Sequence, residues 1–506
     1  MKWNWPTALA AVALVFGLWV RFHGADQRWV WRDEQTTLLH VMGYAESDVD
    51  ASHPSTMGQI AASVSVPAPG GPRAVVSALE REDAQHPPFY YLGQRLWDDA
   101  GGNALGRRSF AVLIGIAAVA AIGWFAFVLS GARAGALSLA FGSVSPFLVL
   151  YGQQMREYGL LCACIALASA LLVVAVRRGS PASWIAYALV SAAALWASPL
   201  ALLPAPAHLV YAAYCDRRRA LLRSVVAWAA AVALFAPWLW AIFVHRKAIV
   251  DANSWSATPY ALPALVAKLL FTASSAFTDL GYANRLGIVL GGLVLIAIAV
   301  AAVVLARTDR GAAVLLGAMV ATTTLLPFVA DLASGQHRSA SSRYLCALVV
   351  VIVVGMACAL ANAPPRIAAP AATALVVLAA LSSYVGTSSP VWWDNHGDSS
   401  LIEIAAVLRR EGAPPVVYDN RCVQLVGLAR IVPANENVLC GPGADAPLEA
   451  GWYVVSPSPR LVARARGAGL KIVSVAGGQD AGEAVRAFRS RQAVADDEPV
   501  LAKIVR

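Results

Sequence analysis

Charged residues are scarce in this sequence. Asp, Glu, Lys and Arg make up 14% of its 506 residues and hydrophobic residues 58%. Soluble domains carry about 25% charged and about 45–50% apolar residues. The shortage excludes an ordinary soluble domain and predicts that most of the chain lies in a membrane. The formal charge of +9 does not indicate nucleic-acid binding, because clusters such as Arg217-Arg218-Arg219 stand between apolar stretches, where basic residues orient helices.

Cysteines are few, and their spacing matches no metal site. Five of the seven lie in or beside apolar runs, where a cysteine is usually a small core residue: Cys162, Cys164, Cys215, Cys346 and Cys358.

Eleven apolar runs are candidate membrane spans, because a hydrocarbon core of about 30 Å needs roughly 20 apolar residues per helix. The first run is interpreted as a retained helix and not a signal peptide, since no small-residue cleavage site follows it. Prolines leave the break between the fifth and sixth runs ambiguous. The runs are 5–22, 107–130, 133–151, 158–176, 181–197, 199–214, 222–244, 286–306, 311–330, 344–362 and 367–386.

Basic residues occupy every second turn between these runs if the N-terminus is cytoplasmic, as the positive-inside rule demands. This orientation places residues 23–106, residues 245–285 and everything after 387 outside. We therefore expect a transmembrane module over 1–386, with a large outer loop over 23–106, and a soluble periplasmic domain over 387–506.

The C-terminal segment changes to a mixed, charged composition. A helical pattern over 399–410 and strand-like runs over 415–418, 452–456, 471–475 and 501–505 predict a small α/β domain. Its only cysteines are Cys422 and Cys440. On the oxidising side of the membrane a disulfide across a loop of this length would stabilise the fold by about 3 kcal/mol, and two buried thiols are the alternative.

Ionisable residues are nearly absent from the middle of the spans. A transporter keeps such groups there as binding or relay sites. His208 is the main exception, and a histidine with structural partners is the favoured interpretation. The ionisable residues instead gather at outer helix ends, which predicts a site facing the outer surface: Arg21, Asp33, Glu34, Arg108, Arg156, Glu157, Asp331 and Arg343.

Three motifs contain several of these residues. Residues 31–34 read Trp-Arg-Asp-Glu, residues 82–91 contain His86 followed by two prolines and three aromatic residues, and residues 151–158 are polar between two spans. Each has a plainer alternative: a solvated acidic pair, a structural turn, and an Arg156 satisfied by Glu157. A guanidinium at that depth requires an anion, which could equally be a lipid phosphate.

Taken in this order and spacing, the motifs resemble C-type integral-membrane glycosyltransferases (GT-C), in particular the protein O-mannosyltransferase and aminoarabinose-transferase superfamily. The likeness looks closest to a bacterial branch with Arg-Glu-Tyr in the third motif. Gln154 stands where many relatives have glutamate, and Met155 replaces a small residue. The residues that carry the resemblance are Asp33-Glu34, His86-Pro87-Pro88-Phe89-Tyr90-Tyr91, Gln153-Gln154-Met155-Arg156, Ser342-Arg343-Tyr344-Leu345 and Trp392-Trp393.

The resemblance implies a polytopic α-helical GT-C-like fold. It also implies that the protein transfers a sugar from a polyprenyl-phosphate donor to a hydroxyl acceptor with inversion. Asp33 would be the general base, with Glu34 orienting it. Arg156 first, then Arg343 and His86, would bind the donor phosphate. No cofactor is expected, although Asp33, Glu34 and His86 would make plausible ligands for a divalent metal. Supporting roles would fall to Glu157, Tyr158, His337, Arg338 and Tyr344.

The expected location is the bacterial inner membrane, with the N-terminus cytoplasmic. The acceptor could be a glycolipid, a cell-wall glycan or a protein, and no nucleic-acid partner is expected. Two other functions remain open. One is a transporter or flippase of lipid-linked sugars, although no internal repeat is visible. The other is a non-catalytic assembly protein on the same fold.

Overall fold

The computed structural model describes residues 4–216, 218–253, 256–257, 259–280, 285–389, 392, 399–418, 420–432, 437–441, 448–476 and 501–506. Arg217 and Trp393, both singled out in the sequence, lie outside these residues.

The chain forms two compact units. The first is helical and comprises Met1–Asp26, Asp83–Gly281 and Arg285–Ser389. The second consists chiefly of Gln27–Glu82 and Pro390–Arg506. The expected outer loop is therefore divided, since residues 27–82 group with the C-terminal segment and residues 83–106 with the helices.

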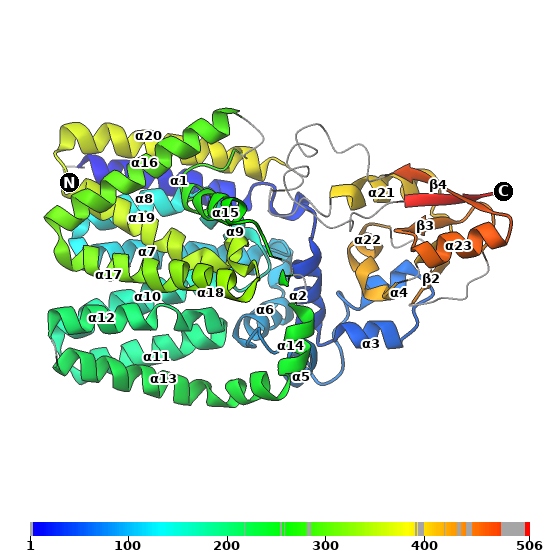
Figure 1. Ribbon diagram of the computed structural model, residues 1–506, viewed down its shortest axis with the longest axis horizontal. Helices are drawn as coiled ribbons and strands as arrows, with labels where there is room; N and C mark the ends of the chain where they lie inside the picture. Colours follow the sequence, from blue (N-terminus) through cyan, green and yellow to red (C-terminus); the bar gives the residue numbers. More distant parts are fainter. Residues whose placement is uncertain are drawn as a thin grey trace. The chain divides into compact units, whose positions relative to one another are not determined.

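The first unit is a bundle of long apolar helices (Figure 1). Among the described residues, eight helices are long and apolar enough to cross a membrane, and a ninth span results if one bent pair is counted. The chain is therefore a multi-pass membrane protein, as predicted. The eight are α1 (Trp5–Phe22), α7 (Ser109–Ser130), α10 (Tyr158–Arg178), α13 (Arg219–Val244), α16 (Arg285–Thr308), Arg310–Ser334 (α17 to α18), Ser342–Ala361 (ending in α19, Cys346–Ala361) and α20 (Pro365–Thr387).

The bent pair is α8 (Ala132–Val144) and α9 (Pro146–Gln153), which meet at 60°. Pro146 begins α9, and its lack of an N–H breaks the helical hydrogen bonding there. Arg21 of α1 is 1% exposed. Its guanidinium donates to Ser143 O and, at 2.9 Å, to Gly142 O. These bonds satisfy backbone carbonyls at the end of α8. Gln153 Nε2 donates back to Arg21 O at 2.8 Å.

The fifth and sixth predicted spans are α11 (Pro181–Ala197, 17 residues) and α12 (Ala205–Cys215, 11 residues), with a short 3₁₀ turn between them. Both are shorter than the other spans, so a total of eleven stays a prediction. His208 of α12 is buried, with Nδ1 2.9 Å from the Tyr187 hydroxyl and Nε2 3.1 Å from Ser169 Oγ. Its partners are structural, as expected.

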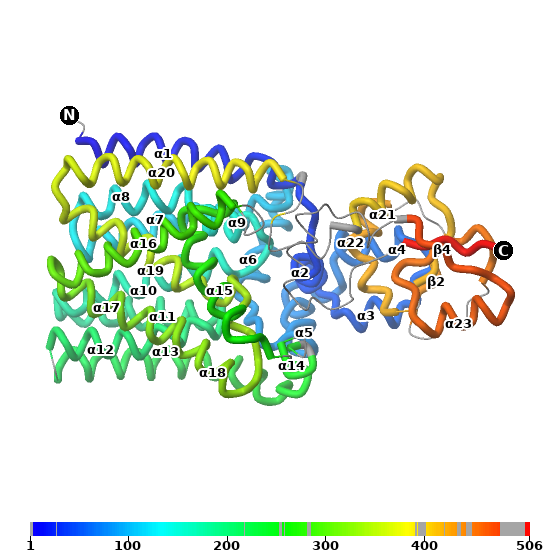
Figure 2. The backbone as a smooth tube through the Cα atoms, turned by 45° about the horizontal axis from the view of Figure 1, so that its top comes forward, coloured from blue at the N-terminus to red at the C-terminus, as the bar shows by residue number. Residues whose placement is uncertain are grey.

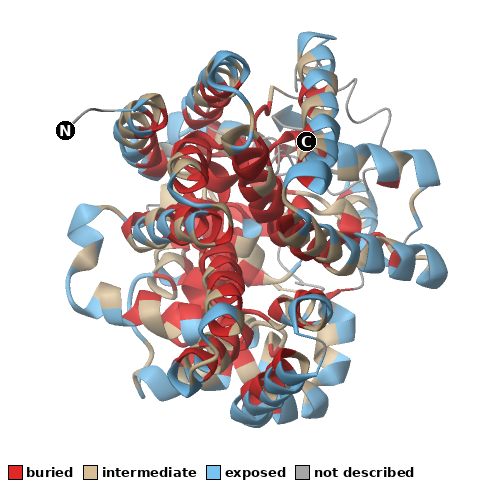
Figure 3. Cartoon of the chain, turned by 90° about the vertical axis from the view of Figure 1, so that its left-hand side faces the viewer, coloured by how far each residue is buried: buried red, intermediate tan, exposed pale blue. Residues whose placement is uncertain are grey.

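Burial separates inner from peripheral helices. In the most apolar stretch of Ser342–Ala361, 78% of residues are buried, against 17% for α16. Figure 3 shows the buried residues as a central column, with exposed faces on the surrounding helices. Those faces are apolar, with Trp240 67% and Ile296 62% exposed, which suits contact with lipid. At one side of the bundle α1 and α20 run side by side (Figure 2).

The C-terminal part of the second unit is the small α/β domain that the sequence predicts. Its sheet has the order β2-β1-β3-β5-β4, with β1 parallel to β2 and β3, and β5 antiparallel to β3 and β4. Val417, Val454, Leu461 and Ile504 form its core. The elements are α21 (Ser399–Arg410), β1 (Val416–Tyr418), α22 (Val426–Ile431), β2 (Val438–Cys440), β3 (Tyr453–Val455), α23 (Pro459–Gly467), β4 (Lys471–Ala476) and β5 (Leu501–Val505).

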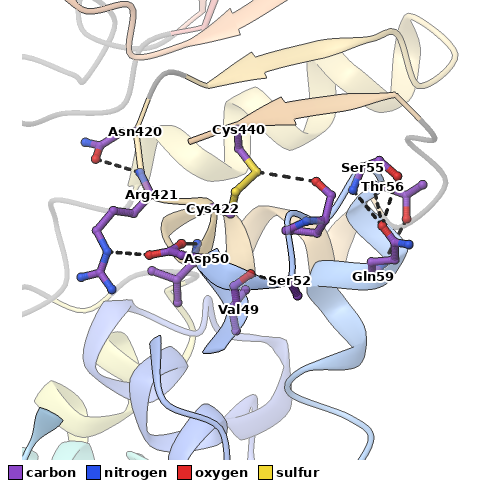
Figure 4. The surroundings of a disulfide bond; sticks show 12 residues. Val49, Asp50, Ser52, Ser55, Thr56, Gln59, Asn420, Arg421, Cys422 and Cys440 are labelled. Atoms are coloured by element: carbon purple, nitrogen blue, oxygen red, sulfur yellow. Dashed lines mark hydrogen bonds and ion pairs between the residues drawn. A yellow bond between two sulfur atoms is a disulfide. The ribbon is translucent and has the colours of Figure 1, made fainter. Parts of the chain in front are cut away.

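Four short helices from the outer loop complete the second unit. In Figure 1 the loop helices α3 and α4 lie beside α22 and β2, although more than 350 residues separate them in the sequence. These helices are α2 (Arg32–Met42), α3 (Glu46–Ala51), α4 (Met57–Ala62) and α5 (Pro72–Glu82). Cys422 and Cys440 form a disulfide with an S–S distance of 2.10 Å, in the same region (Figure 4).

Candidate functional site

The third motif is a buried polar turn between two helices. α9 ends at Gln153 and α10 begins at Tyr158, so Arg156 and Glu157 stand in the short connection. Their exposures are 4% and 1%. Arg156 Nε lies 3.5 Å from Glu157 Oε2, which gives the buried guanidinium a counter-charge.

His86 joins the second motif to the third. Its Nδ1 lies 2.8 Å from Glu157 Oε1 and its Nε2 3.0 Å from Arg156 Nη2. Because an arginine nitrogen can only donate, Nε2 accepts that bond, and the imidazole proton sits on Nδ1 and is donated to Glu157. The three side chains therefore form one hydrogen-bonded cluster, here called the Arg156 cluster (His86, Arg156 and Glu157).

The ionisable groups of this cluster shift one another's pKa values. Burial alone would raise the pKa of Glu157, but the charges of Arg156 and His86 outweigh it and lower that pKa to about 2. Burial lowers the pKa of His86, and Arg156 does the same. The carboxylates of Asp83, 3.7 Å away, and Glu157 oppose them, and the net pKa is raised. Glu157 is therefore ionised, and His86 takes up a proton more readily than an ordinary histidine.

Two tyrosines also contact Arg156. Its Nη1 donates to the Tyr91 hydroxyl at 3.3 Å, and its guanidinium lies 5.7 Å from the centre of the Tyr158 ring. Burial raises the pKa of Tyr91 well above its usual value, so the phenol stays neutral. Tyr91 lies in the first turn of α6 (Phe89–Asp99), which follows the two prolines. The Nη atoms of Arg156 thus donate to Tyr91 and His86, and the Glu157 carboxylate lies at Nε.

The segment that carries His86 is held from two further elements. Trp238 of α13 donates from Nε1 to Ala84 O at 2.9 Å, and Asn253 donates from Nδ2 to Gln85 Oε1 at 2.5 Å. Sequence reasoning missed both. The sequence around a tryptophan in an apolar span, or around an asparagine in a loop, does not show whether the side chain makes such a contact.

Asp33 and Glu34 occupy the first turn of α2 in the second unit, whereas the Arg156 cluster belongs to the first unit. Glu34 is completely buried and Asp33 half-buried. The proposal that Asp33 works with Arg156 therefore rests on the motifs.

Of the remaining predicted residues, His337 and Arg338 contact Ser256 in the first unit. The backbone N–H of His337 donates to Ser256 O at 3.2 Å, and Arg338 Nε donates to Ser256 Oγ at 3.3 Å. The His337 ring stacks on Tyr260 with centroids 4.1 Å apart. Arg343 lies over the ring of its neighbour Tyr344 at 5.4 Å.

In the part of the chain that the structure describes, no group of three or more His, Cys, Asp or Glu side chains is arranged to hold a metal ion.

Comparison with known proteins places this architecture. The family model of dolichyl-phosphate-mannose-protein mannosyltransferases matches residues 85–241. The crystal structure of ArnT from Cupriavidus metallidurans in the apo state superimposes with a TM-score of 0.57 at 12% identity, covering 98% of this chain and 97% of ArnT. The same enzyme bound to undecaprenyl phosphate gives 0.55 at 14% identity with the same coverage. The chain has a GT-C fold.

The GT-C fold confirms the resemblance inferred from the three motifs. The matched segment starts at Gln85 and therefore contains His86 and the residues that follow it in the second motif, the third motif and the whole Arg156 cluster, while Asp33 and Glu34 lie before it. A search of curated protein sequences finds no match to the chain.

Proposed function

We propose that this GT-C protein transfers a sugar from a polyprenyl-phosphate donor to a hydroxyl acceptor at the outer face of the bacterial inner membrane. The observation that carries the proposal is the buried Arg156 cluster, in which a guanidinium lies beside the Glu157 carboxylate at Nε and donates to Tyr91 and His86 through its Nη atoms. The family model and the ArnT fold support it, since the family is described by a lipid-phosphate sugar donor and ArnT has been solved with undecaprenyl phosphate.

Arg156 would hold the phosphate that leaves as the glycosidic bond breaks. A phosphate oxygen is a stronger acceptor than a phenol or an imidazole nitrogen, so it competes well for the Nη contacts now made to Tyr91 and His86. A guanidinium already oriented by Glu157 needs little reorganisation as negative charge develops, which is where electrostatic stabilisation contributes most to rate.

His86 would respond to the arriving phosphate. Once a phosphate oxygen takes the Arg156 Nη2 contact, the His86 Nε2 lone pair no longer accepts a bond from arginine. The imidazole, whose pKa is raised by Asp83 and Glu157, then takes a proton from water and donates it in a hydrogen bond to the phosphate. The donor phosphate thereby gains a second cationic contact.

Asp33 would act as general base. It would accept the proton of the acceptor hydroxyl as that oxygen attacks the anomeric carbon from the face opposite the phosphate, so the configuration inverts. Glu34 would orient Asp33 from the next position of α2. Arg343 is the second choice for a phosphate contact, with His337, Arg338 and Tyr344 as supporting residues.

The test is transfer by purified protein from a panel of radiolabelled polyprenyl-phosphate sugars to membrane acceptors. Asp33→Asn and Arg156→Ala should each lower transfer by at least about 100-fold, a loss of roughly 2.7 kcal/mol of barrier stabilisation, with near-normal expression. Arg178→Ala, at the far end of α10, is the matched control and should transfer normally.

Full transfer by Asp33→Asn would remove the proposed base. Binding of the labelled donors by the wild-type protein with no transfer to any acceptor would favour a carrier of lipid-linked sugars.

A further inference from the structure

The α/β domain contacts the helix that carries Asp33 and Glu34. Gln35, the next residue of α2, is 6% exposed, and its Oε1 accepts from the backbone N–H of Gly427 in α22 at 3.1 Å. Its Nε2 donates to Val30 O at 2.7 Å, just before α2 begins. The buried Gln35 amide thus links the first turn of α2 to the residue Val30 before the helix and to the C-terminal domain.

Gly427 makes room for the Gln35 amide at this contact. A Cβ on it would overlap Gln35 Nε2 and lie 3.0 Å from the Trp29 ring. Its φ is not in the left-handed region, so any residue could adopt its backbone conformation. A methyl group at this position would therefore displace the Gln35 amide from its place between α2 and α22.

A second set of contacts reaches α2 through α3. Arg421 lies 3.0 Å from Glu46 through Nη1 and 2.7 Å from Asp50 through Nε, as Figure 4 shows for the latter. Asp50 also accepts from the backbone N–H of Val423 at 3.1 Å. Glu46 accepts from Thr36 of α2 at 3.2 Å. Each partly exposed pair contributes modestly, but together they fix α3 between the domain and α2.

The disulfide closes the segment that makes these contacts. Cys422 follows Arg421 directly, and Cys440 ends β2, whose Val438 N–H donates to Ser55 O of the outer loop at 2.8 Å. Gly427 lies between the two cysteines. Both ends of the segment that presents Gly427 are therefore anchored on the outer loop (Figure 4).

We infer that the C-terminal domain is a positioning element for α2, holding the Asp33 turn through the Gly427–Gln35 contact and the Arg421 pairs. This inference rests on the proposed function, in which Asp33 is the general base. The domain acts through α2, so its loss affects the chemical step and leaves binding of the lipid donor largely intact.

The test compares Gly427→Ala with Gly467→Ala, a glycine of α23 whose added methyl group would meet nothing within 4 Å. Gly427→Ala should lower kcat at least about tenfold while the donor KM stays within about threefold, and Gly467→Ala should match wild type. Gln35→Met, which removes the amide but keeps the length, should shift kcat in the same direction and serves if Gly427→Ala does not fold.

Backbone hydrogen exchange gives a readout independent of activity. Peptides over residues 32–42 should exchange at least about tenfold faster in Gly427→Ala and in Gln35→Met than in wild type, while those over α10 stay unchanged. Unchanged exchange in α2 would overturn the inference, and so would faster exchange with wild-type kcat. If the wild type itself transfers no sugar, the proposed function fails, and exchange alone decides whether the domain holds α2.

Discussion

Glu157 is a charged partner of the buried Arg156. The sequence left two partners open for this arginine, a neighbouring carboxylate or a lipid phosphate. The structure places the Glu157 carboxylate at Nε, while the Nη atoms donate to Tyr91 and His86, so a phosphate that replaces these two acceptors is compatible with the Glu157 contact. That His86 would contact both Arg156 and Glu157 could not be predicted, because 70 residues separate it from Arg156 and no local pattern records the contact.

Gln154 gives a prediction in which stability and activity move in opposite directions. It is 3% exposed, and among the described residues neither Nε2 nor Oε1 of its side chain has a hydrogen-bond partner. An unpaired buried amide group costs about 1–3 kcal/mol, so Gln154→Met should raise the free energy of unfolding by about 1 kcal/mol or more. If the amide contacts substrate, transfer should fall at least about tenfold.

Thermal unfolding in detergent and the transfer assay measure the two effects. Gln153→Met is the matched control: Gln153 Nε2 donates to Val20 O and Arg21 O at 3.1 and 2.8 Å, so its loss should destabilise the protein. Unchanged transfer by a stabilised Gln154→Met would deny the amide a role in substrate binding.

Glu157 also predicts a pH dependence of stability. Its pKa is about 2 in the folded protein against an ordinary value of 4.5. A depressed pKa means that the ionised carboxylate stabilises the fold above about pH 4.5, and that this stabilisation is lost as the pH falls from about 4.5 towards 2. The melting-temperature difference between wild type and Glu157→Gln should therefore shrink across this window. A difference that stays constant down to pH 2 would contradict the ion pair.

At the scale of elements, the helices were predictable and their bends were not. Every predicted span overlaps a helix, because about twenty apolar residues suffice to identify one. The run over 133–151 contains Pro146, which can break or kink a helix, but the sequence does not give the 60° angle between α8 and α9. Arg21 appeared from the sequence to belong to an outer-facing site, yet it is buried and bonds to the carbonyls that the bend leaves without helical partners.

Arg21→Met should therefore act on the bend. It leaves Gly142 O and Ser143 O without their donor, which should cost about 2–4 kcal/mol of stability. Because α9 leads directly to Arg156, donor binding should weaken as well. Thermal unfolding and binding of a labelled polyprenyl phosphate measure both effects. Arg178→Met, an exposed arginine in the last turn of α10, should change stability by less than about 0.5 kcal/mol. Equal effects of the two substitutions would remove the special role of Arg21.

At the scale of the whole molecule, the sequence predicted a membrane bundle and a small α/β domain but not how the outer loop is shared between the units. Residues 27–82 join the C-terminal segment through contacts such as those of Gly427 and Arg421. A glycine that allows close approach and an arginine that bridges two loop carboxylates look ordinary in a sequence. Hydropathy, in contrast, is summed over whole segments, so a prediction made from it does not depend on which residues a segment contacts.

The basic turns predict an orientation that the native cysteines can test. Of the five free cysteines, only Cys215 is exposed, and it directly precedes the basic turn expected on the cytoplasmic side. A membrane-impermeant maleimide should therefore label wild type only after spheroplasts are permeabilised. Ala463→Cys, on an exposed position of α23, placed in a Cys215→Ser background should label in intact spheroplasts, because the positive-inside rule puts the C-terminal domain outside. The reverse pattern would invert the topology, and labelling of both from one side would require a different number of spans between them.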